Sequence, residues 1–158
     1  MATNQDKFME TLEKAWKDEF EVDIWLQATK ESPVIPCHRI ILAAGAKTFK
    51  EFLEDSEVQP PYLKEKPVPI NNLTHEQLLQ FVRFLYTGSL EHMFLTFDNA
   101  VALYKAANMY DCPLLKQLCE EELTRLQKLD HTTASKIDDL GQTFQDTMLF
   151  EDGDNYYQ

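Results

Sequence analysis

The chain has 158 residues, which is the length of one ordinary domain. Hydrophobic residues make up 44% of it and aromatic residues 11%, enough apolar surface for a buried core, so wholesale disorder is excluded. Fifteen basic and twenty-seven acidic residues give a net charge of -12, which repels phosphate backbones and anionic lipid headgroups. We therefore expect a protein that binds neither nucleic acid nor membranes directly.

The sequence also indicates where the protein works. No apolar run approaches the roughly 18–20 residues that span a bilayer, and the N-terminus has neither the basic nor the apolar segment of a leader. Three cysteines are an odd number at irregular spacing, which favours reduced thiols over a disulfide framework. These features predict a soluble protein of the cytoplasm or the nucleus.

Groups for catalysis or metal binding are sparse. The four glycines are too widely spaced for a phosphate-binding loop, and the pair Cys37-His38 has no second pair at zinc spacing. Neighbours on an extended segment point to opposite faces, so this pair does not form a nucleophilic site. Cys112 and Cys119 are seven residues apart, and we expect both to face a core. The sequence predicts no enzymatic activity, no metal and no cofactor.

The first predicted elements are a helix and a hairpin. Residues 20–28 alternate apolar and polar side chains as a half-buried strand does, and residues 34–37 return after a turn as a second, short strand. Before them, residues 6–18 have the periodicity of a short amphipathic helix. Its apolar stripe, which needs a partner, consists of Phe8, Leu12, Ala15 and Trp16.

Two helical stretches and a loop come next. Residues 39–44 predict a helix, and an amphipathic helix restarts after Gly45. Residues 55–69 contain four of the seven prolines, including Pro60-Pro61, so we expect an extended surface loop. Residues 68–70 at its end predict an edge strand.

Helices dominate the rest of the chain. Thr74 can cap a helix with Gln77 three residues on, and Gly88 ends that helix. A further helix begins near Asp98, and Pro113 begins another. The apolar residues spaced to pack in the first of these two are Val101, Tyr104 and Met109. A small sheet followed by helices predicts the α+β class.

Several stretches carry a family resemblance. They are Asp23-Ile24-Trp25-Leu26, then Ile35-Pro36-Cys37-His38-Arg39-Ile40-Ile41-Leu42-Ala43-Ala44 with Phe49, then Phe84-Leu85-Tyr86-Thr87-Gly88. In this order they resemble the BTB/POZ domain, whose pattern has an aspartate opening a strand, a histidine-basic pair before an apolar helix, and an aromatic-threonine-glycine. Residues 99–110, with the leucines and the cysteine that follow, look like the two closing helices. The resemblance covers about residues 20–125.

The resemblance implies both a fold and a role. The implied BTB/POZ fold is a small, mostly three-stranded sheet packed with about five to six helices, plus an N-terminal helix. Such domains are interaction modules without an active site, usually form two-fold homodimers, and in many cases bind cullin-3 as substrate adaptors of ubiquitin ligases. We expect an N-terminal dimerisation helix over residues 1–19, the BTB/POZ domain over residues 20–128, and an acidic extension over residues 129–158.

Residues of a dimer interface follow from the same resemblance. Asp23 and Arg39 match the acidic and basic positions of a charged pocket near that interface, whereas exposed ion pairs of no special role are the alternative. The helix with Phe8, Leu12 and Trp16 looks like the extra helix that dimeric members pack against the partner subunit. The same apolar stripe could fold onto its own chain, and we expect packing on the partner.

Cullin-binding members share a hydrophobic-any-Glu element in the loop before the last strand. Leu63-Lys64-Glu65 fits that element by type, although counting forward from Phe49 places it at residues 57–59. An ordinary solvated loop is the alternative, because three-residue patterns recur by chance. Tyr110, beside the connection between the two closing helices, is a further candidate.

The last 29 residues hold seven acids against Lys136 alone. They resemble either the approach helix of a second, cut-off BTB domain or a plain acidic tail. For the whole chain, the leading hypothesis is a homodimeric cullin-3 adaptor for a substrate protein that the sequence cannot name. A dimerising scaffold or corepressor-recruiting module without cullin binding is second, and an enzyme is a distant third.

Overall fold

The computed structural model describes residues 1–55, 61–91, 93 and 95–129. The chain divides into two compact units, Met1–Met93 and Phe94–Gln158, which are described one at a time. The described residues form six helices and one three-stranded mixed sheet, so the predicted α+β class is confirmed.

The sheet of the first unit has the strand order β2-β1-β3. Strand β1 (Ile24–Gln27) pairs antiparallel with β2 (Ile35–Cys37) and parallel with β3 (Val68–Pro69). The predicted hairpin and edge strand are therefore confirmed, but β1 is shorter than the predicted strand over residues 20–28. The backbone turns before it, because Glu19 and Glu21 have positive φ angles.

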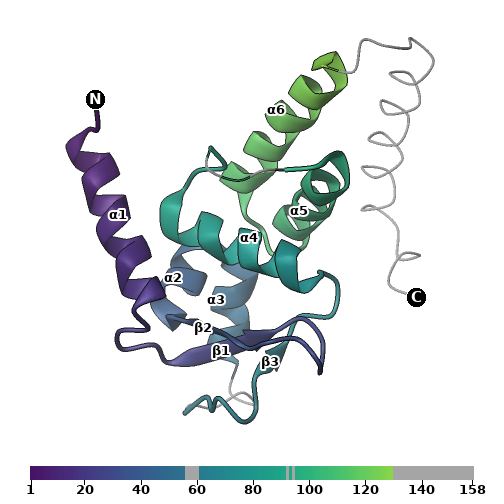
Figure 1. The fold of residues 1–158 in the computed structure, drawn as a ribbon. Coiled ribbons are helices and arrows are strands. Elements are labelled where there is room, and N and C mark those ends of the chain that lie inside the picture. The colour runs from purple at the N-terminus through teal and green to yellow at the C-terminus, as the bar shows by residue number, and fades with distance from the viewer. Residues whose placement is uncertain (56–60, 92, 94, 130–158) are drawn as a thin grey trace. The chain divides into compact units, whose positions relative to one another are not determined.

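Four helices complete the first unit: α1 (Asn4–Lys17), α2 (Arg39–Gly45), α3 (Lys47–Glu54) and α4 (His75–Thr87). Helices α2, α3 and α4 lie on one side of the sheet, while α1 runs beside them with the chain's N-terminus at its far end (Figure 1). The core holds the inward face of the sheet and the facing helix residues. It includes Ile24, Leu26, Ile35, Cys37, Leu42, Phe49, Leu78, Phe81 and Val82.

Local signals set the ends of these helices. Thr74 caps α4 and forms the predicted capping box with Gln77, in which each side chain accepts a hydrogen bond from the other residue's backbone N–H. Gly88 ends α4 with φ 68, in the left-handed region that favours glycine. Gly45 ends α2 where the Leu85 side chain of α4 approaches closely, since a Cβ there would lie 2.6 Å from Leu85 Cδ2.

The second unit consists of α5 (Phe97–Met109) packed on α6 (Pro113–Leu129). The buried residues of α5 are Ala100, Leu103, Tyr104, Ala106 and Ala107. The predicted stripe was therefore partly wrong, because Val101 and Met109 are only half-buried and small alanines provide the contact face. Cys112 and Cys119 are buried and reduced, as predicted.

Neither a membrane-spanning helix nor a metal-binding cluster occurs among the described residues. No helix among them is both long and apolar enough to cross a membrane. No group of three or more His, Cys, Asp or Glu side chains in the same ranges could hold a metal ion. The predicted acidic extension lies, apart from Leu129, outside the described residues, as does the alternative cullin element at residues 57–59.

Candidate interaction surfaces

Helix α1 is attached to its own chain through Trp16. The indole ring is buried and stacks on Tyr86 of α4, with ring centroids 5.2 Å apart and planes inclined by 12°. Its Nε1–H donates to the Pro36 carbonyl oxygen at 2.9 Å, on the outer edge of β2. The aromatic contact anchors the helix, and the hydrogen bond covers a strand edge that would otherwise be open to another chain.

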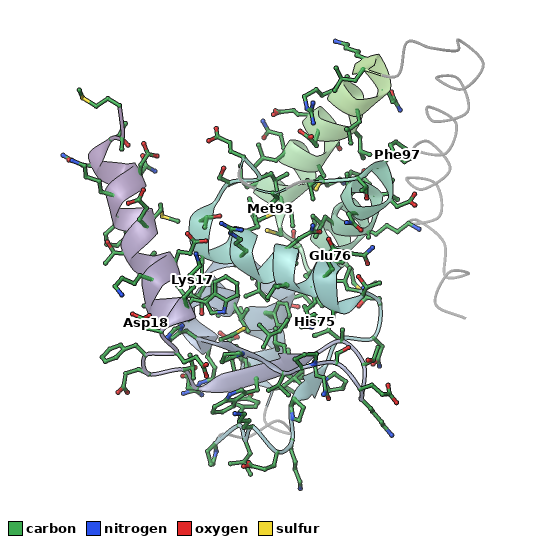
Figure 2. The ribbon with its side chains drawn as sticks, viewed as in Figure 1. Lys17, Asp18, His75, Glu76, Met93 and Phe97 are labelled. Carbon is green, nitrogen blue, oxygen red and sulfur yellow. The ribbon has the colours of Figure 1, made fainter. Side chains whose placement is uncertain are left out.

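An ion pair supports the same contact one turn earlier. Glu13 Oε2 of α1 lies 2.9 Å from Arg83 Nε of α4. The Glu13 side chain is 16% exposed and that of Arg83 35%, so the pair is shielded on the glutamate side. Figure 2 shows Lys17 and Asp18 at the end of α1, where the chain turns toward β1.

The docked face of α1 differs in part from the predicted stripe. Met9, Leu12, Glu13 and Trp16 are half-buried or buried, whereas Phe8 is 62% exposed. Trp16 therefore packs within its own chain and has little surface left for a partner. Of the predicted dimer residues on this helix, Phe8 keeps a free apolar surface and Leu12 a partial one.

The predicted pair of Asp23 and Arg39 is in contact. Asp23 Oδ2 accepts a hydrogen bond from Arg39 Nε at 2.9 Å, and Asp23 Oδ1 accepts one from the Arg39 backbone N–H at 2.8 Å. The second bond caps α2, whose N-cap residue His38 makes no side-chain capping bond. The Arg39 guanidinium also lies 5.8 Å from the ring centroid of Tyr62. In the single chain the two charged side chains are 43% and 41% exposed, so they form a surface ion pair.

This geometry predicts unequal effects of the two partners. Asp23→Ala should lower the free energy of unfolding by about 1–2 kcal/mol, because it removes both the ion pair and a helix cap. Arg39→Gln should lower it by less than about 1 kcal/mol, because it removes only an exposed ion pair. Urea denaturation of both variants measures the difference. A loss of roughly 3–5 kcal/mol for Arg39→Gln alone would instead show that a second chain buries the pair.

His38 joins three parts of the first unit. Its Nε2 lies 2.5 Å from the Phe20 carbonyl oxygen, its Nδ1 lies 2.5 Å from the Tyr86 hydroxyl, and its backbone N–H donates to that hydroxyl at 2.9 Å. A carbonyl oxygen only accepts, so Nε2 carries the proton and Nδ1 accepts from Tyr86. Burial, and then the nearby Cys37, raise the pKa of Tyr86, which keeps its hydroxyl proton available for this bond.

The turn between α1 and β1 is strained. Glu19 and Glu21 have φ angles of 54° and 56°, and a non-glycine residue in this region costs roughly 1–2 kcal/mol. Between them, the Phe20 side chain is 66% exposed. The Glu19 N–H donates to the Trp16 carbonyl and the Phe20 N–H to the Ala15 carbonyl, both at 3.0 Å. The turn is thus tightly held while its aromatic side chain faces solvent.

The cysteines are structural. Burial raises the pKa of Cys37, and that of Cys119 to about 12, so both remain thiols at neutral pH. Burial also raises the pKa of Cys112. A protonated, buried thiol is a poor nucleophile and a poor metal ligand.

The predicted cullin-binding residues lie in two different units. Leu63 and Glu65 are exposed, with the Leu63 side chain 47% exposed, and Tyr110 is the C-cap residue of α5. The Lys66 N–H donates to the Leu63 carbonyl at 3.0 Å, which closes a tight turn over residues 63–66. The segment was expected to be extended, and that expectation was wrong because this local hydrogen bond reverses the chain.

Two exposed apolar residues were not singled out from the sequence. The sequence pattern predicts Phe20 as the first residue of a strand and Ile40 as part of the apolar run of α2. Ile40 is 73% exposed, near the start of α2. A signal existed for Ile40, since it lies two residues before the buried Leu42 and therefore on the opposite face of the helix. Nothing in the pattern separated Phe20 from its predicted strand.

A small mixed sheet with helices on one side of it defines an α+β fold, and several large apolar side chains of this fold remain exposed. The family model of the BTB/POZ domain matches residues 12–127. The chain therefore belongs to the BTB/POZ family, whose members are protein-protein interaction modules.

Individual relatives agree with this assignment. A putative BTB/POZ domain-containing protein of Arabidopsis thaliana is 31% identical over 148 residues, which cover 90% of this chain and 69% of that protein. Kelch-like protein 40a of Danio rerio is 30% identical over 100 residues, which cover 63% of this chain and 15% of that protein. The solved BTB domain of zebrafish PATZ1 is 16% identical, with a TM-score of 0.61 over 79% of this chain and 97% of that one, which shows the fold.

Proposed function

We propose that this BTB/POZ domain pairs with a second copy of itself and links the pair to cullin-3 as a substrate adaptor. The observation that carries the pairing is the outward face of α1. The helix is held on its own chain by Trp16 and Glu13, yet it presents Phe8 to solvent at 62% exposure. An aromatic side chain held in water by a firmly attached helix supports an interface at this face.

The net charge of the chain opposes pairing, so the affinity of pairing should depend on salt. Two chains of charge -12 repel each other, so apolar contact has to supply the attraction. Because salt screens this repulsion, pairing should tighten as the ionic strength rises. An interface dominated by ion pairs would show the opposite trend.

Cullin-3 binding is supported by the family and by the turn over residues 63–66. Many BTB domains bind cullin-3 through a hydrophobic-any-Glu element, and a Kelch-like protein is among the relatives. Leu63 and Glu65 match that element by type and are both exposed. A partner could therefore reach an apolar anchor and a neighbouring charge on one short turn.

Phe8→Ser should weaken pairing by at least tenfold, because a buried aromatic anchor of an interface contributes well over 1 kcal/mol. Light scattering over a dilution series gives the dissociation constant. Leu129→Ser is the matched control, since Leu129 is 64% exposed on α6 and has no role in the proposed interface. A monomeric mass of the unchanged chain at tens of micromolar would contradict the pairing.

A pull-down with the N-terminal region of cullin-3 tests the second half of the proposal. Binding by the paired chain is the expected result. Pairing without cullin-3 binding would favour the dimerising scaffold, which the sequence left as the alternative.

A further inference from the structure

The turn between α1 and β1 holds the backbone of an exposed aromatic residue in one conformation. Phe20 is flanked by two non-glycine residues in the left-handed region, Glu19 and Glu21. Backbone strain of this kind persists only where the surrounding structure enforces it, and it concentrates at functional positions. The enforcing contacts here are the two backbone hydrogen bonds of the turn and the bond from His38.

His38 connects this turn to the core. The Tyr86 hydroxyl donates to Nδ1 and accepts from the His38 backbone N–H, while Nε2–H donates to the Phe20 carbonyl. Tyr86 is 1% exposed and stacks on Trp16, so its ring is packed in the core. The position of the Phe20 backbone is therefore set by the imidazole of His38 through a chain of hydrogen bonds that ends in α4.

An exposed aromatic side chain on a restrained backbone is suited to be an interface anchor. Aromatic anchors carry much of the energy of protein interfaces, and a backbone that is already restrained loses little entropy on binding. Phe20 is 66% exposed and most other large aromatics of the first unit are buried or half-buried. Its burial by another molecule would remove this apolar surface from water.

A second copy of this chain is the occupant that the surface favours. Phe20 is bonded to the residue that precedes α2, and α2 carries Ile40 at 73% exposure. With Phe8 on α1, these three exposed side chains together offer on the order of 400 Å² of apolar surface per copy, against roughly 800 Å² per partner in a standard interface. A two-fold interface uses this surface twice.

We propose that Phe20 is an anchor of the pairing surface for a second copy, and that His38 is a positioning residue that holds Phe20 in place. This inference rests on the pairing proposed above, and it assigns the affinity of pairing to Phe20 and to the hydrogen bonds of His38. His38 acts through Phe20 and needs no contact with the partner.

The test measures the dissociation constant of pairing by light scattering and sedimentation for single and double variants. Phe20→Ala should weaken pairing roughly 30-fold, as loss of an interface anchor does. Leu129→Ala, a change at a similarly exposed residue on α6, should leave it unchanged. Tyr86→Phe keeps the stack on Trp16 but removes the hydroxyl, and it should weaken pairing by roughly threefold to tenfold.

The double variant decides the role of His38. If His38 and Tyr86 act only by positioning Phe20, adding Tyr86→Phe to Phe20→Ala should weaken pairing no further. His38→Gln, which removes the middle member of the same chain of hydrogen bonds, gives a second variant in case Tyr86→Phe impairs folding. Effects that simply multiply would overturn the positioning role.

The remaining outcomes separate the two proposals. Pairing of the unchanged chain with no effect of Phe20→Ala would overturn Phe20 as an anchor and leave the pairing intact. A monomeric unchanged chain would overturn both.

Discussion

Trp16→Ala should lower the free energy of unfolding by about 3–5 kcal/mol, the usual loss for removing a buried tryptophan. The side chain is buried, stacks on Tyr86 at 5.2 Å and donates to the Pro36 carbonyl. Its removal leaves a cavity under α1 and frees the outer edge of β2. Urea denaturation at one fixed protein concentration measures the effect.

Trp16→Phe separates the two contributions. It retains an aromatic ring against Tyr86 but loses the indole N–H, so the loss should be about 1–2 kcal/mol. If Trp16→Ala left unfolding unchanged and abolished pairing instead, α1 would pack on a partner chain, as the sequence led us to expect. The structure of the single chain supports the first result.

Leu63→Ala should weaken cullin-3 binding by roughly 2 kcal/mol or more, because an apolar anchor at an interface centre carries much of the binding energy. Adding Glu65→Ala should weaken cullin-3 binding further, since the Glu65 carboxylate lies on the same turn and would set the register of the partner. Calorimetric titration with the N-terminal region of cullin-3 gives both values.

Leu79→Ala is the matched control for this series. Leu79 is 39% exposed on α4, against 47% for Leu63, so both changes remove a similar exposed leucine. Unchanged affinity in the Leu63→Ala, Glu65→Ala double variant would discard the turn as the cullin site.

Local chemistry explains why so much of the fold could be predicted. The N-terminal cap of α4 depends on Thr74 and on a side chain three residues later, and the C-terminal cap depends on the φ preference of Gly88. Both signals are local in the sequence. The hairpin of β1 and β2 follows from alternation over a few residues and a short turn. The order of the family motifs then indicated the BTB/POZ fold and brought Asp23 and Arg39 together as a candidate pair.

Contacts between distant residues decided the rest. Helical periodicity showed that α1 is amphipathic, but Met9 takes the place of Phe8 on the docked face because Glu13 meets Arg83, seventy positions along the chain. Likewise, Phe20 leaves its predicted strand because His38, eighteen residues away, binds its carbonyl. A sequence pattern records which side chains are apolar, whereas the choice of which apolar side chains remain in water depends on the partners that tertiary packing supplies. The sequence alone therefore determined most of the elements and the family, and only the tertiary structure decided that Phe8, Phe20 and Ile40 are among the apolar side chains that remain in solvent.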